Sequence, residues 1–373
     1  MKQIITILLC LCLLLTGCAK APAETIAPTP TTETPTQATE APTTEPTTEP
    51  TTVPTTEPTE PPVLYRHPIT GVPMDEPLME KPVGVVINNI RSAQPLHGIG
   101  AADVICEIMV EGGGSITRLL AVYTDLENAG KVGSIRSART YLVDLARSFG
   151  YAPIVHCGYS THAQKEIVRT KYPSFNQSFY GKYFYRDQAR KNAGYATEHT
   201  LFAESPDLIR GMEENSFTLA TENPVDYGWQ FSEDVVLNGQ TANQLTCQFY
   251  STGGKKTVMA YDADMGVYYG TQIWKTREEN FYDANTDEAI PFKNVLMIFA
   301  KTTTNGKHMF AELSGEGTGY YACNGQVVPI KWVREDPSHP FTYFYEDGTP
   351  VTFGVGKTYL GVLATCSPDV IIE

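Results

Sequence analysis

The sequence is short of basic residues, and this shortage excludes two classes of protein. Its 373 residues include 28 Lys and Arg against 42 Asp and Glu, a formal net charge of −14. Proteins that bind nucleic acid, or that adhere to anionic lipid by charge, need an excess of positive side chains. The longest apolar run, residues 4–15, is too short to cross a bilayer core of roughly 30 Å as a helix. The composition therefore excludes a nucleic-acid-binding protein and an integral membrane protein.

Motifs of common hydrolases and of penicillin-binding proteins are also missing from residues 63–373. The sequence contains no HExxH, no GxSxG and no Ser-x-x-Lys there. Residues 354–358 resemble the end of a phosphate loop, but Val351 replaces the first glycine. In a similar way Glu288 stands where a calcium loop needs glycine. We therefore expect no cofactor and no metal, and the sequence identifies no catalytic residue.

The cysteines give no disulfide framework. Three of the eight lie in or directly after the leader, and five remain in the body: Cys106, Cys157, Cys247, Cys323 and Cys366. An odd number without a close pair matches neither a disulfide scaffold nor a zinc site. One or two bridges are compatible with the sequence, which does not determine their pairing, and single thiols packed in the core are the favoured interpretation.

What is present at the N-terminus is typical of an export signal. Residues 1–3 carry Lys2, residues 4–15 are apolar, and Leu15-Thr16-Gly17-Cys18 matches the lipobox of bacterial lipoproteins. In that class the signal is cut before the cysteine, whose thiol carries a diacylglycerol. The alternative is an ordinary cleavage site beside a chance cysteine. We predict a signal peptide at 1–17 and a lipid anchor on Cys18, at the extracytoplasmic face of the cell membrane.

Residues 18–62 form a low-complexity segment after the predicted anchor. Thr-Thr-Glu-Pro occurs at 43–46, 47–50 and 55–58, and the segment contains almost no large apolar side chain. Proline fixes φ and removes backbone donors, and too little apolar surface remains to offset the entropy of ordering. We predict a disordered tether that holds the body away from the membrane.

The body, residues 63–373, has 26 basic and 35 acidic residues and two regions of different character. In the first, about 80–225, apolar periodicity predicts strands at 82–90, 103–111, 117–124 and 153–158, and helices at 137–149, 161–170 and 206–214. In the second, about 235–366, it predicts strands at 246–250, 257–261, 266–274, 294–300, 310–313, 319–323, 326–332 and 358–365. The expected fold is α+β, with a mixed α/β N-terminal domain and a β-rich C-terminal domain. The strand 103–111 alternates apolar and polar residues, which predicts one solvated face.

Four segments of the body are distinctive in combination: KPVGVVINN (81–89), VEGG (110–113), GSIRSART (133–140) and GKTY (356–359). With them the whole body resembles the YerB-like lipoproteins of Gram-positive bacteria. The resemblance implies a two-domain envelope lipoprotein whose biochemical role is not established, and it supplies no catalytic set. Relatives tend to have Pro-His-Asn where this chain has Glu198-His199-Thr200.

Residues 133–139 are the first candidate binding site. Ser137 is a candidate N-cap for the predicted helix 137–149, so free backbone N–H groups would lie beside two guanidiniums, those of Arg136 and Arg139. Such an arrangement suits a carboxylate or a phosphate, and Arg118 of the neighbouring strand is expected to join it. The alternative is internal ion pairing of Arg136 and Arg139 with Glu107, Glu111 or Asp144.

Four further residues are candidates for ligand or partner binding. Asn88 and Asn89, with Arg91 shortly after them, end a buried strand, where sheets often present binding groups, or they cap their own turn. Glu111 precedes a glycine-rich turn at 112–115 and is either at a site or a solvated strand end. His156 cannot form a dyad with Cys157, because adjacent strand residues face opposite sides of the sheet.

Three hypotheses of function follow from these observations. The first is a non-enzymatic, lipid-anchored envelope protein that binds cell-wall-associated proteins or an anionic wall component. The second is an enzyme acting on peptidoglycan or another wall polymer, with Glu107 or Glu111 and His156 as acid and base. The third is a solute-binding lipoprotein with a cleft between two domains. The missing catalytic motifs and the long tether favour the first.

Overall fold

The computed structural model describes residues 65–111, 116–249, 254–275, 277–306, 308–367 and 369–373. These all belong to one compact unit, residues 61–373. The predicted signal peptide, Cys18, the tether and the glycine-rich turn 112–115 lie outside the described residues. None of the helices in the described part of the chain is long and apolar enough to cross a membrane.

A twelve-stranded sheet runs through the centre of this unit. In spatial order it contains β12 (Gln240–Thr241), β23 (Gln326–Arg334), β22 (Gly315–Cys323), β20 (Asn294–Asn305), β26 (Thr358–Ala364), β4 (Val104–Met109), β5 (Thr117–Tyr123), β3 (Val83–Asn89), β7 (Ile154–His156) and β8 (Ser174–Asn176). Two further strands pair at its side, β21 (His308–Glu312) with β20 and β24 (Thr342–Tyr345) with β23.

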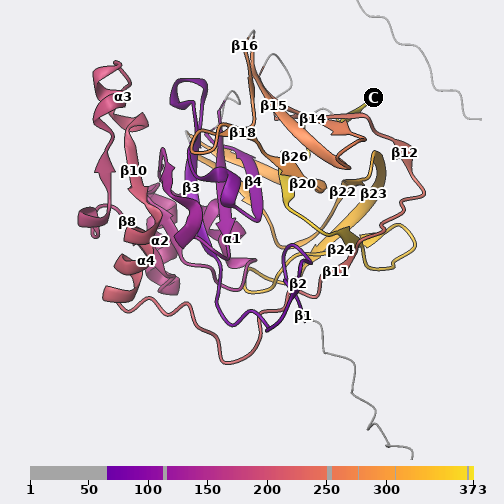
Figure 1. The fold of residues 1–373 in the computed structure, drawn as a ribbon, viewed down its shortest axis with the longest axis horizontal. Helices are drawn as coiled ribbons and strands as arrows, with labels where there is room; N and C mark the ends of the chain where they lie inside the picture. The colour runs from indigo at the N-terminus through magenta and orange to yellow at the C-terminus, as the bar shows by residue number, and fades with distance from the viewer. Residues whose placement is uncertain (1–64, 112–115, 250–253, 276, 307, 368) are drawn as a thin grey trace, which may run out of the picture. The chain divides into compact units, whose positions relative to one another are not determined.

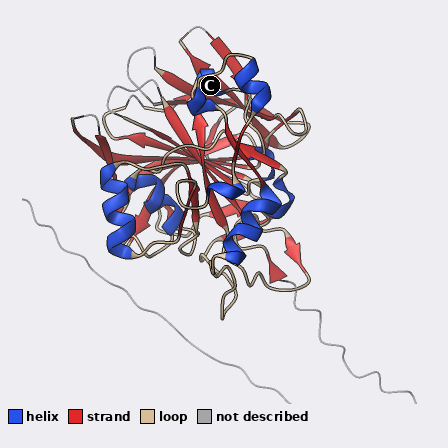
Figure 2. Ribbon diagram, turned by 90° about the vertical axis from the view of Figure 1, so that its left-hand side faces the viewer, coloured by secondary structure: helices blue, strands red, loops and turns tan. Residues whose placement is uncertain are grey.

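Smaller elements surround this sheet. A six-stranded sheet contains β16 (Arg277–Asn280), β15 (Val267–Trp274), β14 (Lys255–Asp262), β13 (Gln244–Gln248), β27 (Ile371–Ile372) and β19 (Pro291–Phe292). The remaining strands are β6 (Lys131–Gly133), β10 (Leu201–Glu204) and β9 (Tyr185–Arg186) in one sheet, and the pairs β1 (Tyr65–Arg66) with β2 (Pro73–Met74), β11 (Gln230–Ser232) with β25 (Thr352–Gly354), and β17 (Tyr282–Asp283) with β18 (Glu288–Ala289). The helices are α1 (Thr140–Arg147), α2 (Thr161–Thr170), α3 (Gln188–Asn192) and α4 (Ser205–Glu214). They lie around the strands (Figure 2).

Strand β26 joins the two regions that the sequence distinguishes. It pairs in parallel with β20 on one side and with β4 on the other, from Thr358 opposite Val104 to Val362 opposite Ile108. In Figure 1 this late strand lies beside strands from the beginning of the body. The fold is mostly β and compatible with the expected α+β class. The expected domain boundaries stay a prediction, but strands from both regions are hydrogen-bonded in one sheet.

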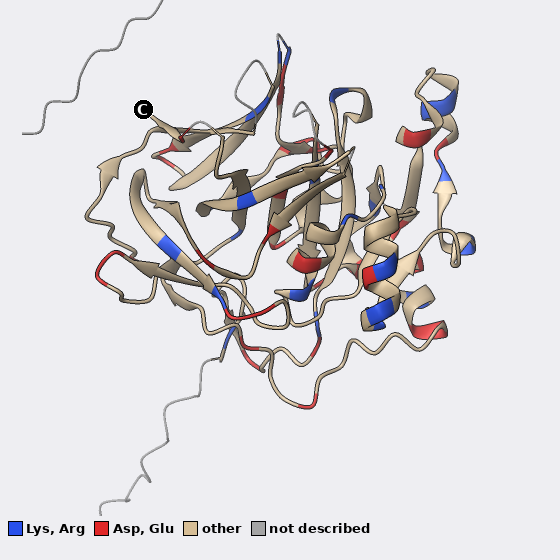
Figure 3. Cartoon of the chain, turned by 180° about the vertical axis from the view of Figure 1, so that it is seen from behind, with Lys and Arg blue, Asp and Glu red and all other residues tan. Residues whose placement is uncertain are grey.

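Two apolar cores cover the two faces of the large sheet. One contains Ile87, Ile105 and Leu119 together with Leu245 and Met259 of the six-stranded sheet. The other contains residues of β3, β4 and β5 facing the opposite way, together with α1 and strands β20 and β23. The strands buried on both faces are rich in Val, Ile and Leu, as such positions require. Most charged residues lie instead on helices, loops and strand ends (Figure 3).

The local predictions agree with the structure where periodicity is strong. Helix α2 has the predicted bounds, and the hydroxyl of Ser160 caps it by accepting a hydrogen bond from the backbone N–H of Ala163 at 3.2 Å. The prediction of a solvated face for residues 103–111 was wrong. Every β4 residue from Val104 to Ile108 is buried, Glu107 included, because the six-stranded sheet covers the expected solvent face.

One buried cation ties the β-rich region to α1. Arg334 of β23 is only 1% exposed, and its guanidinium donates to the carbonyl oxygens of Asp144 (2.9 Å), Leu313 (3.2 Å), Pro337 (2.7 Å) and His339 (2.8 Å). The Asp144 carbonyl lies near the C-terminal end of α1, where helix carbonyls need outside donors.

We expect Arg334→Met to lower the free energy of unfolding by about 3 kcal/mol, because several buried carbonyls lose their donor. Lys331→Met is the matched control, since Lys331 is an exposed residue of the same strand. Urea unfolding of both variants and of the wild type measures the difference. Equal destabilisation by the two substitutions would contradict a specific role for Arg334.

Candidate functional site

A cavity of about 1010 Å³ opens where β3 ends and β5 begins. Its walls come from residues 90–95 after β3, Ile116 before β5, residues 193–199, and Trp274, Arg277, Glu279 and Tyr282 around β16. We call it the strand-end pocket. It brings together segments of both sequence regions, residues near 90 and residues near 277.

Cationic and aromatic side chains characterise the strand-end pocket. Arg91 and Arg277 line it, and Glu279 pairs with Arg277 at 2.9 Å. Tyr195, Trp274 and Tyr282 contribute rings. Guanidiniums recognise carboxylates and phosphates through paired hydrogen bonds, and rings provide flat surfaces for apolar or sugar groups. In a chain of net charge −14, a pocket with two arginines and one carboxylate is locally positive.

His199 forms part of the same pocket and is buried in a polar cluster. Its Nδ1 lies 2.9 Å from the side-chain nitrogen of Asn88, and its Nε2 lies 3.1 Å from the hydroxyl of Ser92. Burial lowers the pKa of His199; Arg136 and Arg190 add to this effect, and Glu198 opposes it. With the Asn88 amide donating to Nδ1, the neutral ring donates from Nε2 to Ser92. Asn88 therefore supports the pocket wall from within β3.

The three predicted arginines lie together, next to this wall. Arg118 is buried, and its guanidinium donates to the carbonyl of Ser137 at 2.6 Å. Burial, together with the charges of Arg139 and Arg136, lowers the pKa of Arg118 to about 9. We call Arg118, Arg136 and Arg139 the arginine cluster.

Two carboxylates accompany the arginine cluster. Arg139 forms a short ion pair with Glu111, and Arg136 lies 4.0 Å from Glu198. Glu111 is thus the partner of a guanidinium and not a solvated strand end. Internal pairing with Glu111, one of the partners named in the alternative, describes Arg139, whereas Arg136 lies near Glu198, which that alternative did not name. A ligand role for the cluster stays a prediction.

The predicted helix cap at Ser137 was wrong. Helix α1 starts at Thr140, and its N-cap residue is Arg139, which makes no side-chain capping bond. Residues 135–138 are engaged in sheet-like bridges instead, Ile135 with Ile87 and Ala138 with Tyr159. These bridges keep the backbone extended at Ser137, so the helix begins only at Thr140. The free N–H groups of the helix start are therefore not located at Ser137, where the prediction placed them.

Asn89 lies in a buried polar network rather than in a turn. Its side-chain nitrogen donates to Glu107 Oε1 at 3.0 Å and contacts the hydroxyl of Thr117 at 2.9 Å. Glu107 Oε1 also pairs with the ammonium of Lys255 at 2.9 Å, while Oε2 accepts from Tyr359 at 2.8 Å. Gln94, which lines the strand-end pocket, donates to Asn89 at 3.3 Å and so connects the pocket to the network.

His156 is a core histidine with both ring nitrogens satisfied. Nδ1 donates to the carbonyl of Gly158 at 2.6 Å, so Nε2 accepts from the hydroxyl of Ser174 at 2.7 Å. The enzyme hypothesis needs His156 next to Glu107 or Glu111, and the structure separates His156 from Glu107. Glu107 lies on the face covered by the six-stranded sheet, and β5 and β3 stand between β4 and β7. Strands spaced ~4.8 Å apart place β4 and β7 roughly 14 Å from each other.

No group of three or more His, Cys, Asp or Glu side chains is arranged to hold a metal ion within the described ranges. The five body cysteines are free thiols, with Cys106, Cys247 and Cys323 buried. Core packing of single thiols, the favoured interpretation, describes these three.

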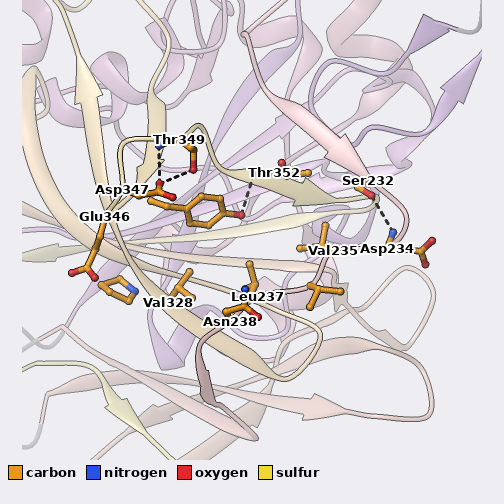
Figure 4. Close-up of a pocket in the computed structure, with 13 residues that line it drawn as sticks. Ser232, Asp234, Val235, Leu237, Asn238, Val328, Glu346, Asp347, Thr349 and Thr352 are labelled. Carbon is orange, nitrogen blue, oxygen red and sulfur yellow. Dashed lines mark hydrogen bonds between the residues drawn. The ribbon is translucent and has the colours of Figure 1, made fainter. Parts of the chain in front are cut away.

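A second cavity of about 690 Å³ lies between β11, β23 and β24. Figure 4 shows Val235, Leu237 and Val328 gathered inside it, with carboxylates at its margins. The lining includes Asp234, Glu346 and Asp347 but no Lys or Arg. This cavity therefore repels anions, whereas the strand-end pocket attracts them.

Sequence reasoning missed half of the strand-end pocket. The sequence did indicate Arg91, which follows a predicted buried strand together with Asn88 and Asn89. Nothing in the sequence indicated that Trp274 and Arg277 belong to a binding site, because the apolar pattern at 266–274 predicts only a strand of the second region. A pocket built from residues near 90 and near 277 exists only after the second sheet packs on the first.

Two family models match the chain in succession. Residues 69–218 match the N-terminal domain, and residues 245–360 the C-terminal domain, of a family described as a protein of unknown function (DUF3048). Together these ranges cover most of the chain. The chain belongs to this YerB-like, DUF3048 family, as the sequence motifs predict.

Similar individual proteins come from Bacillus subtilis. YerB of strain 168, a lipoprotein by name, is 25% identical over 313 residues, which are 79% of this chain and 85% of the relative. A crystal structure of the YerB protein from Bacillus subtilis matches with a TM-score of 0.69 at 22% identity, and the match covers 83% of this chain and 99% of that one. The two proteins share a fold.

The buried His156 predicts a specific acid sensitivity. Burial lowers its pKa to about 4, against an ordinary value near ~6.5 in the unfolded chain. Between these values the unfolded chain binds a proton that the folded chain does not, so the stability from neutral His156 is complete above pH ~6.5 and declines as the pH falls toward ~4.

The substitution His156→Gln keeps one hydrogen-bond donor and one acceptor but removes the titrating ring. We expect the free energy of unfolding to fall by about 3 kcal/mol less in this variant than in the wild type when the pH is lowered from 7 to 4. Urea unfolding at the two pH values measures the difference. The same pH dependence in both proteins would contradict the assignment.

Proposed function

We propose that the protein is a lipid-anchored protein of the bacterial cell envelope that binds an anionic cell-wall component in the strand-end pocket. The role is binding or regulatory, without catalysis. The observation that carries the proposal is the pairing of Arg91 and Arg277 with three aromatic rings in a large pocket of an otherwise acidic chain.

The anchoring half of the proposal rests on the N-terminal sequence. A lipobox at 15–18 and a Pro- and Thr-rich segment to residue 62 place the body at a distance from the membrane. If the segment were fully extended as polyproline II, it would reach on the order of 136 Å at ~3.1 Å per residue. A relative named as a lipoprotein supports the same interpretation.

The binding half rests on the chemistry of the pocket walls. Carboxylates and phosphates are the anionic groups of wall polymers, and guanidiniums bind both through fixed, paired N–H donors. His199, held neutral by burial, offers an aromatic wall without adding charge. The arginine cluster lies behind this wall and adds positive potential through Arg136.

We expect Arg91→Ala combined with Arg277→Ala to weaken binding to isolated cell walls roughly 10- to 100-fold, because two charge-assisted contacts are lost. Co-sedimentation of the purified mature chain with walls, before and after removal of their anionic polymers, measures this. Arg169→Ala with Arg210→Ala is the matched control, since it removes the same charge from exposed positions on α2 and α4. Unchanged binding of the first variant would refute the pocket assignment.

In-cell cross-linking distinguishes a protein partner from a wall polymer. Capture of one dominant envelope protein, lost in the Arg91/Arg277 variant, would make the pocket a protein-docking site and the protein a regulator of that partner. Capture of wall fragments would support the proposal as stated.

We expect Cys18→Ser to move the protein from the membrane fraction to the soluble fraction, because the acyl chains have no other attachment site. Fractionation of cells expressing the variant and the wild type measures the shift. Retention of the Cys18→Ser protein in the membrane fraction would contradict the anchor.

A further inference from the structure

Three buried side chains from three strands meet at one carboxylate. Asn89 ends β3, Glu107 lies in the middle of β4, and Lys255 begins β14 of the second sheet. All three are fully buried, with 0% of each exposed. The amide nitrogen of Asn89 and the ammonium nitrogen of Lys255 lie 3.0 Å and 2.9 Å from the same oxygen, Glu107 Oε1.

This group contains the parts of an amide-forming reaction. Lys255 supplies an amine, Asn89 supplies an acyl carbon with an amine leaving group, and Glu107 lies between them as a proton carrier. We propose that Lys255 Nζ and the side-chain carbonyl carbon of Asn89 become joined by an amide bond, with Glu107 transferring the protons.

The reaction balances without any co-reactant. The Lys255 ammonium gives one proton to Glu107 Oε1, and the neutral amine attacks the Asn89 carbonyl carbon, Cγ. The new bond is Nζ–Cγ, and the bond that breaks is Cγ–Nδ2. Glu107 returns its proton to Nδ2, a second proton leaves Nζ by the same carboxylate, and ammonium departs. A primary amide and an alkylammonium become a secondary amide and ammonium.

The surroundings favour the neutral amine that the attack needs. The rings of Trp274 and Phe249 lie 5.1 Å and 5.8 Å from Lys255 Nζ, and no water-exposed surface remains on the residue. Burial lowers the pKa of Lys255, and Glu107 opposes that shift. Fixed neighbours in a dry site react as if at very high concentration, because they have lost their freedom before the reaction starts.

The rest of the network holds the carboxylate in place for this transfer. Thr117 donates to Oε1 at 2.6 Å, and Thr257 and Tyr359 donate to Oε2 at 2.7 Å and 2.8 Å. The product would replace a buried ion pair, whose desolvation is costly, with a neutral amide. It would also bind β3 of the large sheet covalently to β14 of the small one, which suits a protein exposed outside the membrane.

Peptide mapping of the full mature chain, isolated from membranes in detergent and fully denatured, tests the proposal. Trypsin should fail to cut after Lys255, and mass spectrometry should find one branched peptide that joins the Asn89 and Lys255 segments. Its mass should equal the two peptides less one ammonia. Recovery of both segments only as linear peptides, with cleavage after Lys255, would overturn the proposal.

Matched variants then identify the chemistry. Lys255→Arg should abolish the branched peptide, and Lys256→Arg, one residue along the same strand, should keep it. Glu107→Gln should abolish or greatly reduce it while preserving the shape of the side chain. A branched peptide in Lys255→Arg, or full cross-linking in Glu107→Gln, would contradict the assigned roles. The wild-type map decides the main question even if a variant fails to fold.

Discussion

The pairing of β26 with β4 and β20 is the interaction on which the rest of the structure depends. Thr358–Ala364 is buried along its whole length and is hydrogen-bonded in parallel to strands from both regions of the body. Strands buried on both faces need apolar side chains, and this one has them apart from Thr358 and Gly361. Since β26 is close to the C-terminus, the central sheet is complete only when nearly the whole chain is present.

The polar interior follows from that pairing. Tyr359 of β26 brings its hydroxyl to Glu107, and the six-stranded sheet closes over the same face with Lys255 and Thr257. A carboxylate in such a place must be fully hydrogen-bonded, and this one accepts from five side chains. The strand-end pocket lies at the margin of this interior, connected to it through Gln94 and Asn89. The same strands thus form the apolar core, hold the hydrogen-bonded network around Glu107 and support the strand-end pocket.

Local sequence patterns predicted the helices and strands whose formation depends mainly on residues close by in the sequence. Helix α2 and strands β3 and β5 agree with their patterns to within a residue or two, because capping, periodicity and β-branching act over short distances. Strand β4 shows the limit. Its polar alternation was read as a solvated face, yet Glu107 is buried because a sheet more than a hundred residues later covers it.

The candidate sites divide in the same way. Arg118, Arg136 and Arg139 were expected to gather, and they do: Arg118 lies on β5, and Arg136 and Arg139 lie in the segment between β6 and α1. The cap at Ser137 failed because residues 135–138 form bridges to distant strands that no local pattern reveals. Trp274 and Arg277 entered the strand-end pocket without any signal, for the same reason.

The sequence by itself predicted the export signal and the tether, and it determined the family and most element positions, because each depends on residue types within a short window. Only the tertiary structure decided that the two regions share one sheet, that Glu107 meets Lys255 and Asn89, and that Arg91 and Arg277 line one pocket. Those outcomes depend on which strand pairs with which, and pairing between distant strands is chosen by burial of whole faces rather than by any local preference.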